Sequence, residues 1–251
     1  MNQDHEVKKY VKDRYGRIAI TRESCCSCCG GPGTTEQAKS MGYTEKEICS
    51  LPPEALMGLG CGNPTALAEL KEGETVLDLG CGGGLDVFLA AQRVGPTGRV
   101  IGIDMTPEMI AKTQENARQG DYGNVDFRLG EIESLPVENN SIDVIISNCV
   151  INLTTDKLAA YREAHRVLRP GGRILISDLV TEGSLPEDIR KSFEAWAECI
   201  AGAMEKGEYL EIIASAGFRD VAIAAEKTYG EPGLDDRLAG KITSIQVKAF
   251  K

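Results

Sequence analysis

The chain has 251 residues, 42% of them apolar, and a formal net charge of −10. A chain of this size can bury a sizeable core in one domain with elaborations. The acidic surface disfavours a nucleic-acid partner because it repels phosphates. No apolar run approaches the length of a membrane span, and the first residues lack the basic-then-apolar pattern of a signal peptide. We therefore expect a cytoplasmic protein that contacts neither nucleic acid nor membrane.

Cysteine is the unusual component of this chain. There are nine cysteines but only two histidines, His5 and His165. Because stable disulfides are rare in the cytosol, an excess of cysteine there indicates metal, soft-ligand or redox chemistry. An enzyme that relies on imidazole for acid–base catalysis would be hard to build from two histidines.

Residues 1–72 are predicted to form an N-terminal extension. It contains a short helix over about residues 7–16 and then a cysteine-rich loop at 25–33, where glycine and proline favour irregular structure. A capping box at 44–47 opens a second short helix, which carries Cys49.

Residues 73–180 alternate between strand and helix patterns, which predicts a parallel sheet with helices on both faces. Thr106 and Pro107 are suited to the start of one helix, and Gly120 to its end. The predicted strands are 76–79, 99–103, 125–129, 142–147 and 173–177, and the predicted helices include 85–93 and 156–168.

The alternation of strands and helices does not continue in residues 181–251. Helices are predicted over about 186–217, followed by two strands, 218–226 and 243–250, that would close the sheet as a pair. The fold class is therefore α/β: a doubly wound, mostly parallel, Rossmann-like sheet. The N-terminal extension and a C-terminal helical and β elaboration flank this core.

The glycine turn after the first strand, residues 80–84, predicts a nucleoside site. Gly80 and Gly82 allow the backbone to approach a ligand, and Asp104, at the tip of the second strand, is suited to the two hydroxyls of a ribose. Asp78 adds a carboxylate where a phosphate would be repelled. A nucleoside with a cationic tail, such as S-adenosylmethionine, is favoured over a dinucleotide.

The other strand ends supply further candidate side chains, because ligands of such sheets bind beyond the carboxyl ends of the strands. Met105 follows the second strand, and Glu131 and Ile132 follow the third, where an acidic or apolar pair could touch adenine. Asn148 and Cys149 follow the fourth. Cys149 would therefore stand where the methyl donor presents its sulfonium.

The remaining cysteines are ambiguous when each is considered alone. Cys199 lies at the edge of an apolar helical stripe and could be core packing, and Cys49 is equally uncertain. Cys81 and Cys61 lie in glycine-rich turns that need small residues, so a structural role is favoured for both.

Cys25, Cys26, Cys28 and Cys29 resemble a metal site, but four thiolates within five residues do not easily surround one tetrahedral zinc. A thiol-relay loop is favoured, with an ordinary surface loop as the alternative.

No base is evident beside the donor site, which suits an acceptor with a free lone pair. A soft atom held by thiolates would account both for the excess of cysteine and for the absence of an evident base.

These motifs resemble those of the arsenite methyltransferases. The similarity covers about residues 40–250 and is carried by four segments: 60–64, 76–84, 147–152 and 196–200. The glycine motif is shared by many methyltransferases, whereas Cys149 and Cys199 in their local contexts are far more specific.

The resemblance implies that Cys149 and Cys199 bind trivalent arsenic, with Cys49 as the third thiolate, and that S-adenosylmethionine donates the methyl group without a required metal. It also implies that the loop at 25–29 helps to deliver arsenite, or its thiol adducts, or exchanges disulfides. Thioredoxin or glutathione would restore the thiols.

Two other functions remain open from the sequence. One is a carbon-directed methyltransferase acting on a quinone or sterol, which would need neither Cys149 nor Cys199. The other is a non-catalytic protein that sequesters arsenic or mercury on its thiols.

Overall fold

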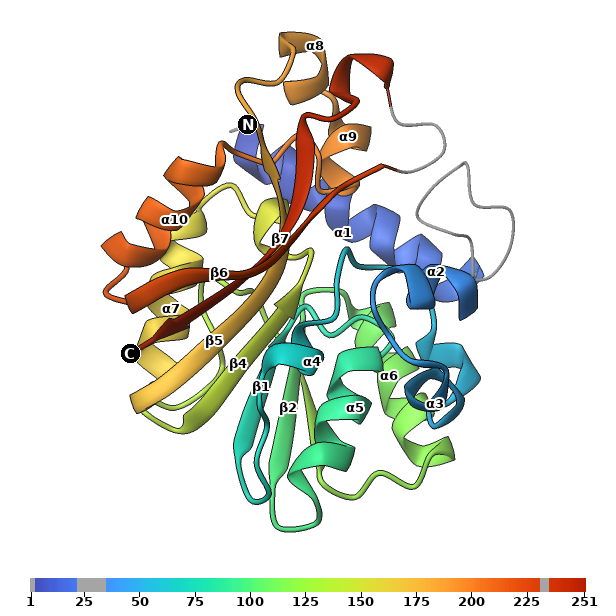
Figure 1. Ribbon diagram of the computed structural model, residues 1–251. Coiled ribbons are helices and arrows are strands. Elements are labelled where there is room, and N and C mark those ends of the chain that lie inside the picture. Colours follow the sequence, from blue (N-terminus) through green and yellow to red (C-terminus); the bar gives the residue numbers. More distant parts are fainter. Residues whose placement is uncertain (1–2, 22–34, 231–234) are drawn as a thin grey trace.

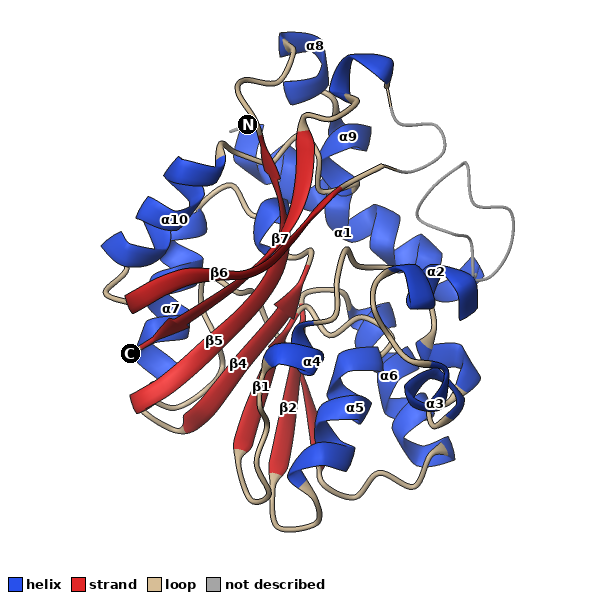
Figure 2. Cartoon of the chain, in the orientation of Figure 1, coloured by secondary structure: helices blue, strands red, loops and turns tan. Residues whose placement is uncertain are grey.

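The computed structural model describes residues 3–21, 35–230 and 235–251, so the cysteines at 25–29 lie outside the described residues. Its centre is a seven-stranded sheet (Figures 1 and 2). The strands are β1 Thr75–Leu79, β2 Arg99–Asp104, β3 Val125–Leu129, β4 Ile142–Asn148, β5 Leu168–Thr181, β6 Arg219–Thr228 and β7 Ile242–Phe250.

The strand order is β3-β2-β1-β4-β5-β7-β6. The first five strands in this order are parallel, whereas β7 is antiparallel to both β5 and β6. The chain order reverses between β1 and β4, which is where ligands bind in open parallel sheets. The predicted doubly wound fold and the predicted closing pair of strands are both confirmed.

Helices cover both faces of the sheet. The buried side chains of α5 and α6 form one core with one face of β1, β2 and β4, and those of α7 and α10 form another with the opposite face. The helices are α1 Gln3–Thr21, α2 Thr35–Ser40, α3 Glu45–Cys49, α4 Pro64–Leu67, α5 Leu85–Val94, α6 Pro107–Gln119, α7 Lys157–Val167, α8 Glu187–Arg190, α9 Phe193–Ala197 and α10 Lys206–Ser215. Three 3₁₀ turns are η1 Pro53–Ala55, η2 Ile151–Leu153 and η3 Asp236–Leu238.

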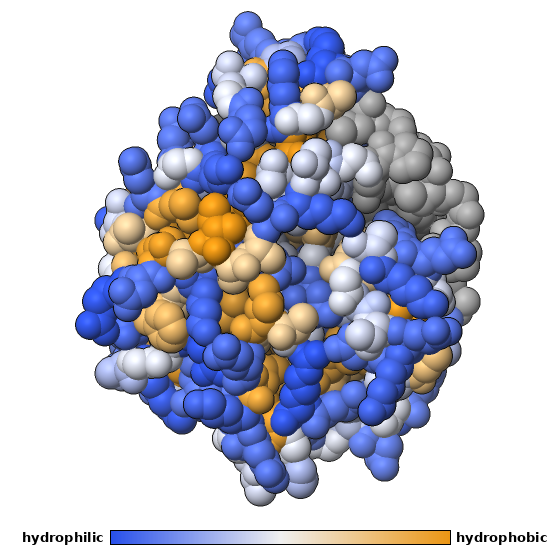
Figure 3. Space-filling view, viewed as in Figure 1, coloured by the Kyte–Doolittle hydropathy of each residue, from blue (hydrophilic) through white to orange (hydrophobic). Residues whose placement is uncertain are grey.

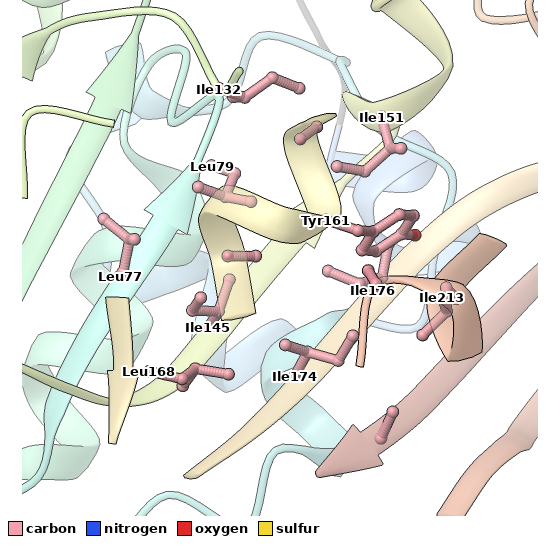
Figure 4. Close-up of a cluster of buried hydrophobic side chains, with 14 of the residues drawn as sticks. Leu77, Leu79, Ile132, Ile145, Ile151, Tyr161, Leu168, Ile174, Ile176 and Ile213 are labelled. Carbon is pink, nitrogen blue, oxygen red and sulfur yellow. The ribbon is translucent and has the colours of Figure 1, made fainter. Parts of the chain in front are cut away.

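The second of these cores appears in Figure 4. Alternate residues of the central strands, such as Ile145 and Ile174, point to this face and contact side chains of α7 and α10, among them Tyr161 and Ile213. All four are fully buried or nearly so. Burying one such aliphatic side chain contributes roughly 1.5–3 kcal/mol. This packing fixes the positions of the strand ends that carry the site.

Two local details differ from the sequence predictions. β5 begins at Leu168, five residues before the predicted strand, because the Pro-Gly-Gly segment at 170–172 is accommodated as an irregularity in its pairing with β4. Thr106 occupies the N-cap of α6, but its side chain makes no capping bond. Its backbone N–H instead donates to Asp104 Oδ1 at 2.9 Å.

The terminal regions are joined closely to the central sheet. β6 and β7, assigned from sequence to the region 181–251, complete the same sheet as the strands of 73–180. In the extension, α1 is longer than the predicted helix 7–16 and packs against α6 and α9 (Figure 1).

The surface is mostly polar on the face shown in Figure 3, with apolar side chains gathered over the place where α10 and β6 lie in Figure 1. Among the described residues, none of the helices combines the length and the apolar character that crossing a bilayer requires.

Candidate active site

A cavity of about 230 Å³ lies at the carboxyl ends of β1, β2 and β4. The sequence predicted eight donor-site residues and three arsenic-binding cysteines. Nine of these eleven residues line the cavity: Asp78, Gly80, Gly82, Asp104, Met105, Ile132, Asn148, Cys149 and Cys199. Because these residues come from strand ends and the loops that follow them, the sheet order brings them together.

The glycine turn forms one wall of the cavity. Gly80 has φ +71°, and a Cβ there would lie 2.3 Å from Val150 Cγ2, so only glycine fits. Gly82 donates its backbone N–H to Asp104 Oδ2 at 3.1 Å. Burial raises the pKa of Asp104, although backbone N–H groups of Thr106 and Gly82 oppose the rise by stabilising the carboxylate. The turn and the carboxylate are thus held in a fixed relation.

Two further carboxyl groups lie behind this turn. Burial, and then the neighbouring Asp86 and Asp104, raise the pKa of Asp78 well above its usual value. Burial raises the pKa of Asp86 to about 6, and the hydrogen bond from Tyr43 counteracts part of that rise. Tyr43 Oη donates to Asp86 Oδ1 at 2.8 Å. A cationic ligand group would stabilise the ionised form of these carboxyls.

Asn148, at the end of β4, links the two sides of the cavity. Its Nδ2 donates to Asp86 Oδ2 at 3.2 Å and to the carbonyl of Gly62 at 2.7 Å. Its Oδ1 accepts from the backbone N–H of Cys61 at 2.9 Å. Gly60, next to Cys61, has φ +122°, and a Cβ there would lie 2.8 Å from the Asn148 amide. This side chain therefore fixes the glycine-rich loop over the mouth of the sheet.

Three thiols lie at this end of the sheet: Cys149 and Cys199, which line the cavity, and Cys61, which follows the lining residue Gly60. The Sγ atoms of Cys61 and Cys149, together with a carboxylate oxygen of Asp178, all lie within 4.8 Å of one another. Cys199 Sγ donates to the Cys149 carbonyl at 2.8 Å. The cluster joins three loops that are distant in sequence.

The electrostatic surroundings favour the protonated thiols of Cys149 and Cys199. Burial, and then hydrogen bonds with Cys199 and Cys61, raise the pKa of Cys149 well above its usual value. For Cys199, the hydrogen bond with Cys149 lowers the pKa, but burial and the Asp178 carboxylate outweigh it, so the pKa is raised. A positive centre that binds several sulfurs would reverse this preference.

The backbone at two of the thiols is strained. Cys149 has φ +58° and Cys199 has φ +63°, the left-handed region that non-glycine residues rarely adopt. Such strain persists only where the surrounding structure imposes it, and it clusters at functional sites. The Cys149 N–H, for example, donates to the carbonyl of Ser177 at 2.8 Å.

The N-terminal helix α1 covers the cavity. Lys8, Val11 and Tyr15 line it. Lys8 Nζ lies 2.9 Å from Glu131 and 3.1 Å from Glu133, and Tyr15 Oη donates to the Ala197 carbonyl at 3.1 Å. The extension therefore contributes directly to the site.

Glu131 is placed differently from its neighbour Ile132. Ile132 lines the cavity, whereas the Glu131 side chain is 53% exposed, pairs with Lys8 and does not line it. Glu133, two residues on, does line the cavity. The strand-end pair predicted to touch adenine is thus divided between the cavity and its rim.

Cys49 is not brought to the thiol cluster. It is exposed at the end of α3 and does not line the cavity. The next residue, Ser50, bonds to Gln92 near the C-terminal end of α5 at 3.2 Å. This contact ties the end of α3 to the end of α5 that lies away from the glycine turn.

Sequence reasoning missed Cys61 as a member of the cluster, and it missed Tyr15 and Glu133. The available signal for Cys61 was its place in the segment 60–64, which is part of the family resemblance. The glycines on either side of Cys61 were instead interpreted as evidence for a structural turn.

Comparisons with known proteins agree on the family. Residues 70–217 match the model of a methyltransferase domain. Arsenite methyltransferase of Halobacterium salinarum is 44% identical over 230 residues, which is 87% of this chain and 59% of that protein. The human arsenite methyltransferase is 34% identical over 229 residues, 86% of this chain and 59% of that protein. The chain thus spans about three fifths of the length of these curated relatives.

A crystal structure of an arsenic(III) S-adenosylmethionine methyltransferase from Chlamydomonas reinhardtii aligns with a TM-score of 0.70 and 34% identity. The match covers 88% of this chain and 75% of that one. The chain belongs to the arsenite methyltransferase family.

Proposed function

We propose that this member of the arsenite methyltransferase family transfers methyl groups from S-adenosylmethionine to trivalent arsenic held on Cys61, Cys149 and Cys199. The observation that carries the proposal is a cluster of three thiols at the cavity that holds the glycine turn and Asp104. Cys149 and Cys199 line this cavity, and the Cys61 sulfur lies within 4.8 Å of the Cys149 sulfur. Trivalent arsenic is a soft centre that forms three bonds, so three convergent sulfurs suit it.

The residues around the glycine turn fit the parts of the donor. Asp104 would hold the ribose hydroxyls, and the buried carboxyls of Asp78 and Asp86 would face the cationic end. Gly80 leaves room that a Cβ would fill. When bound, S-adenosylmethionine supplies an electrophilic methyl group on a sulfonium.

Thiol exchange would load the acceptor. As(OH)₃ and three cysteine thiols give a tris-thiolate and three waters, and a thiol adduct of arsenite releases three free thiols in the same way. The arsenic lone pair would then attack the methyl group in line with the departing sulfur, so the protein would contribute chiefly by positioning. The rate would therefore depend on how the residues of the cavity position the two reactants, and no general base would be needed.

Methylation formally oxidises arsenic from the trivalent to the pentavalent state. Two protein thiols can return two electrons by forming a disulfide, and thioredoxin or glutathione would reduce that disulfide by thiol exchange. Because the proposal requires reduced thiols, it fits a cytoplasmic setting.

The position of Cys61 supports its role as third ligand in place of Cys49. Cys61 is anchored by Asn148 and by Ser244, whose Oγ donates to the Cys61 carbonyl at 2.8 Å. Cys49 is exposed, and it is neither in the cluster nor among the residues that line the cavity. Cys49→Ser is therefore a matched control for Cys61→Ser.

The decisive experiment supplies methyl-labelled S-adenosylmethionine and arsenite to the reduced full chain and separates the products by chromatography with arsenic detection. We expect labelled methylarsenicals, and we expect turnover to stop after the first cycle without added thiol. Donor binding without any labelled arsenical would contradict the proposal and would point to a carbon acceptor or to sequestration.

A further inference from the structure

Asp178 lies at the thiol cluster, although trivalent arsenic has no need of a carboxylate. It is fully buried, and one of its oxygens is within 4.8 Å of both Cys61 Sγ and Cys149 Sγ. Its Oδ1 accepts from the N–H of Leu179 at 3.0 Å, and its Oδ2 accepts from Tyr209 Oη and from the N–H of Asn152, each at 3.1 Å. A carboxylate has about four acceptor positions, so one remains.

Two sulfurs and one carboxylate oxygen form a ligand set for a thiophilic divalent cation. Zinc binds cysteine sulfur at about 2.3 Å and carboxylate oxygen at about 2.0–2.2 Å, which places neighbouring ligand atoms of a tetrahedron roughly 3.3–3.8 Å apart. A contraction of about 1 Å from the observed 4.8 Å limit would therefore close the set around a cation. Side-chain torsions alone can supply such a change.

We propose that Cys61, Cys149 and Asp178 form a binding site for a d¹⁰ divalent cation of the Zn²⁺ or Cd²⁺ class, with the fourth position open. This cation site is distinct from the three-sulfur set of the proposed function, because it uses Asp178 and omits Cys199. Cys199 keeps its proton and its bond to the Cys149 carbonyl. The inference does not depend on arsenic methylation.

The charges at the cluster suit such a cation. Binding of the dication would displace the protons of Cys61 and Cys149 to solvent. The two thiolates and one carboxylate would then carry three negative charges, which the dication and the neighbouring ammonium of Lys157 would match. Lys157 is buried, and its Nζ donates to the Thr154 carbonyl at 3.4 Å. A buried charge is tolerated where it is matched and hydrogen-bonded.

A direct consequence is mutual exclusion of the cation and arsenite. Both would need the sulfurs of Cys61 and Cys149, so each would block the other. Bound cation would also keep these two thiols from forming a disulfide. The site would thus hold the thiols in an inactive, protected state until the cation is removed.

The test measures Cd²⁺ binding by its sulfur-to-metal absorption in the ultraviolet, and Zn²⁺ binding by competition with a chromophoric chelator. Neither donor nor arsenite is present. The reduced full chain is compared with the same chain carrying serine at positions 25, 26, 28 and 29, so that binding by that loop is subtracted. Cys49→Ser is the control for an unrelated thiol.

Two variants separate the cation site from the arsenic set. Asp178→Asn should weaken Cd²⁺ binding at least tenfold while arsenite still binds. Cys199→Ser should weaken arsenite binding while Cd²⁺ still binds. Cys61→Ser should weaken both. Equal Cd²⁺ affinity in Asp178→Asn and the natural chain would overturn the proposal, as would loss of Cd²⁺ binding in Cys199→Ser. Arsenite binding by the natural chain, measured beside these, reports separately on the proposed function.

Because Asp178 also holds backbone N–H groups, a measurement on the natural chain guards against a folding defect in the variant. X-ray absorption at the zinc edge should show two sulfurs at about 2.3 Å and oxygen at about 2.0–2.2 Å. A shell of sulfur alone would overturn the assignment of Asp178. Preloaded Zn²⁺ should delay arsenite binding, and a chelator should restore it; simultaneous binding would contradict the shared thiols.

Discussion

The two sides of the cavity are built in different ways. The glycine-turn side comes from one continuous stretch, 76–104. Its carboxylate, Asp104, accepts hydrogen bonds from the backbone N–H of Thr106, two residues along the chain, and of Gly82, at the end of the adjacent strand. The thiol side joins Cys61, Cys149 and Cys199, whose separations along the chain are 88 and 50 residues. A local motif is thus paired with a cluster that exists only in the folded protein.

The glycine-turn side and the thiol side come from different segments of the chain, so each can be disabled separately. Asn148 is the exception, because it bonds to Asp86 on one side and to the backbone of Cys61 on the other. Substitutions of other residues should therefore affect either donor binding or acceptor binding.

The largest effect is expected for Cys149→Ser. Serine nearly preserves the shape but offers a hard oxygen to a soft centre, so arsenite methylation should fall at least about a hundredfold, equal to roughly 2.7 kcal/mol. Donor affinity, measured by calorimetry, should stay near that of the natural chain. Turnover of arsenite at the natural rate would show that Cys149 is not a ligand.

Cys61→Ser should separate the two arsenic substrates. Arsenite has three positions for sulfur, whereas monomethylarsenite has only two left, which Cys149 and Cys199 can fill. Methylation of arsenite should be lost and that of monomethylarsenite retained, whereas Cys49→Ser should change neither. Chromatography of the products with each substrate decides this, and a loss confined to Cys49→Ser would restore Cys49 as the third ligand.

Asp104→Ala tests the local side of the comparison. Loss of a hydrogen bond that involves a charged group costs roughly 1.5–3 kcal/mol, so donor affinity should fall about tenfold to a hundredfold. Arsenite binding to the thiols should be unaffected. Unchanged donor affinity in calorimetry would remove Asp104 from the ribose site.

The last prediction concerns folding stability rather than binding or turnover, and it depends on pH. The pKa of Asp86 is raised to about 6 from 3.8, so the folded protein binds more protons than the unfolded chain between these values. Its free energy of unfolding should therefore fall as pH rises from about 4 to 6, by at most about 1.4 kcal/mol per pH unit. Asp86→Asn should flatten this slope in denaturant titrations; an identical slope would place the titration elsewhere.

Much of the fold follows from local patterns. The alternation of apolar runs and helical segments predicted β1 to β4 within a residue or two at each end, because buried parallel strands need continuous apolar sequence. The start of β5 was missed because its pairing with β4 passes through a Pro-Gly-Gly irregularity. The α1 helix was predicted too short, since its stability comes from packing on α6 and α9 rather than from its own sequence pattern.

The glycine turn and the positions of Asp104 and Cys149 at strand ends could be predicted from the sequence, since each depends on neighbours within one strand–turn–helix unit. Only the tertiary structure decided which thiols meet. The sequence favoured Cys49 as the third thiolate and a structural role for Cys61. In the structure Ser50 ties the end of α3, which carries Cys49, to the C-terminal end of α5, while Asn148 holds the backbone of Cys61 at the mouth of the sheet. Long-range hydrogen bonds of this kind leave no local pattern, so the cluster appears only when the chain has folded.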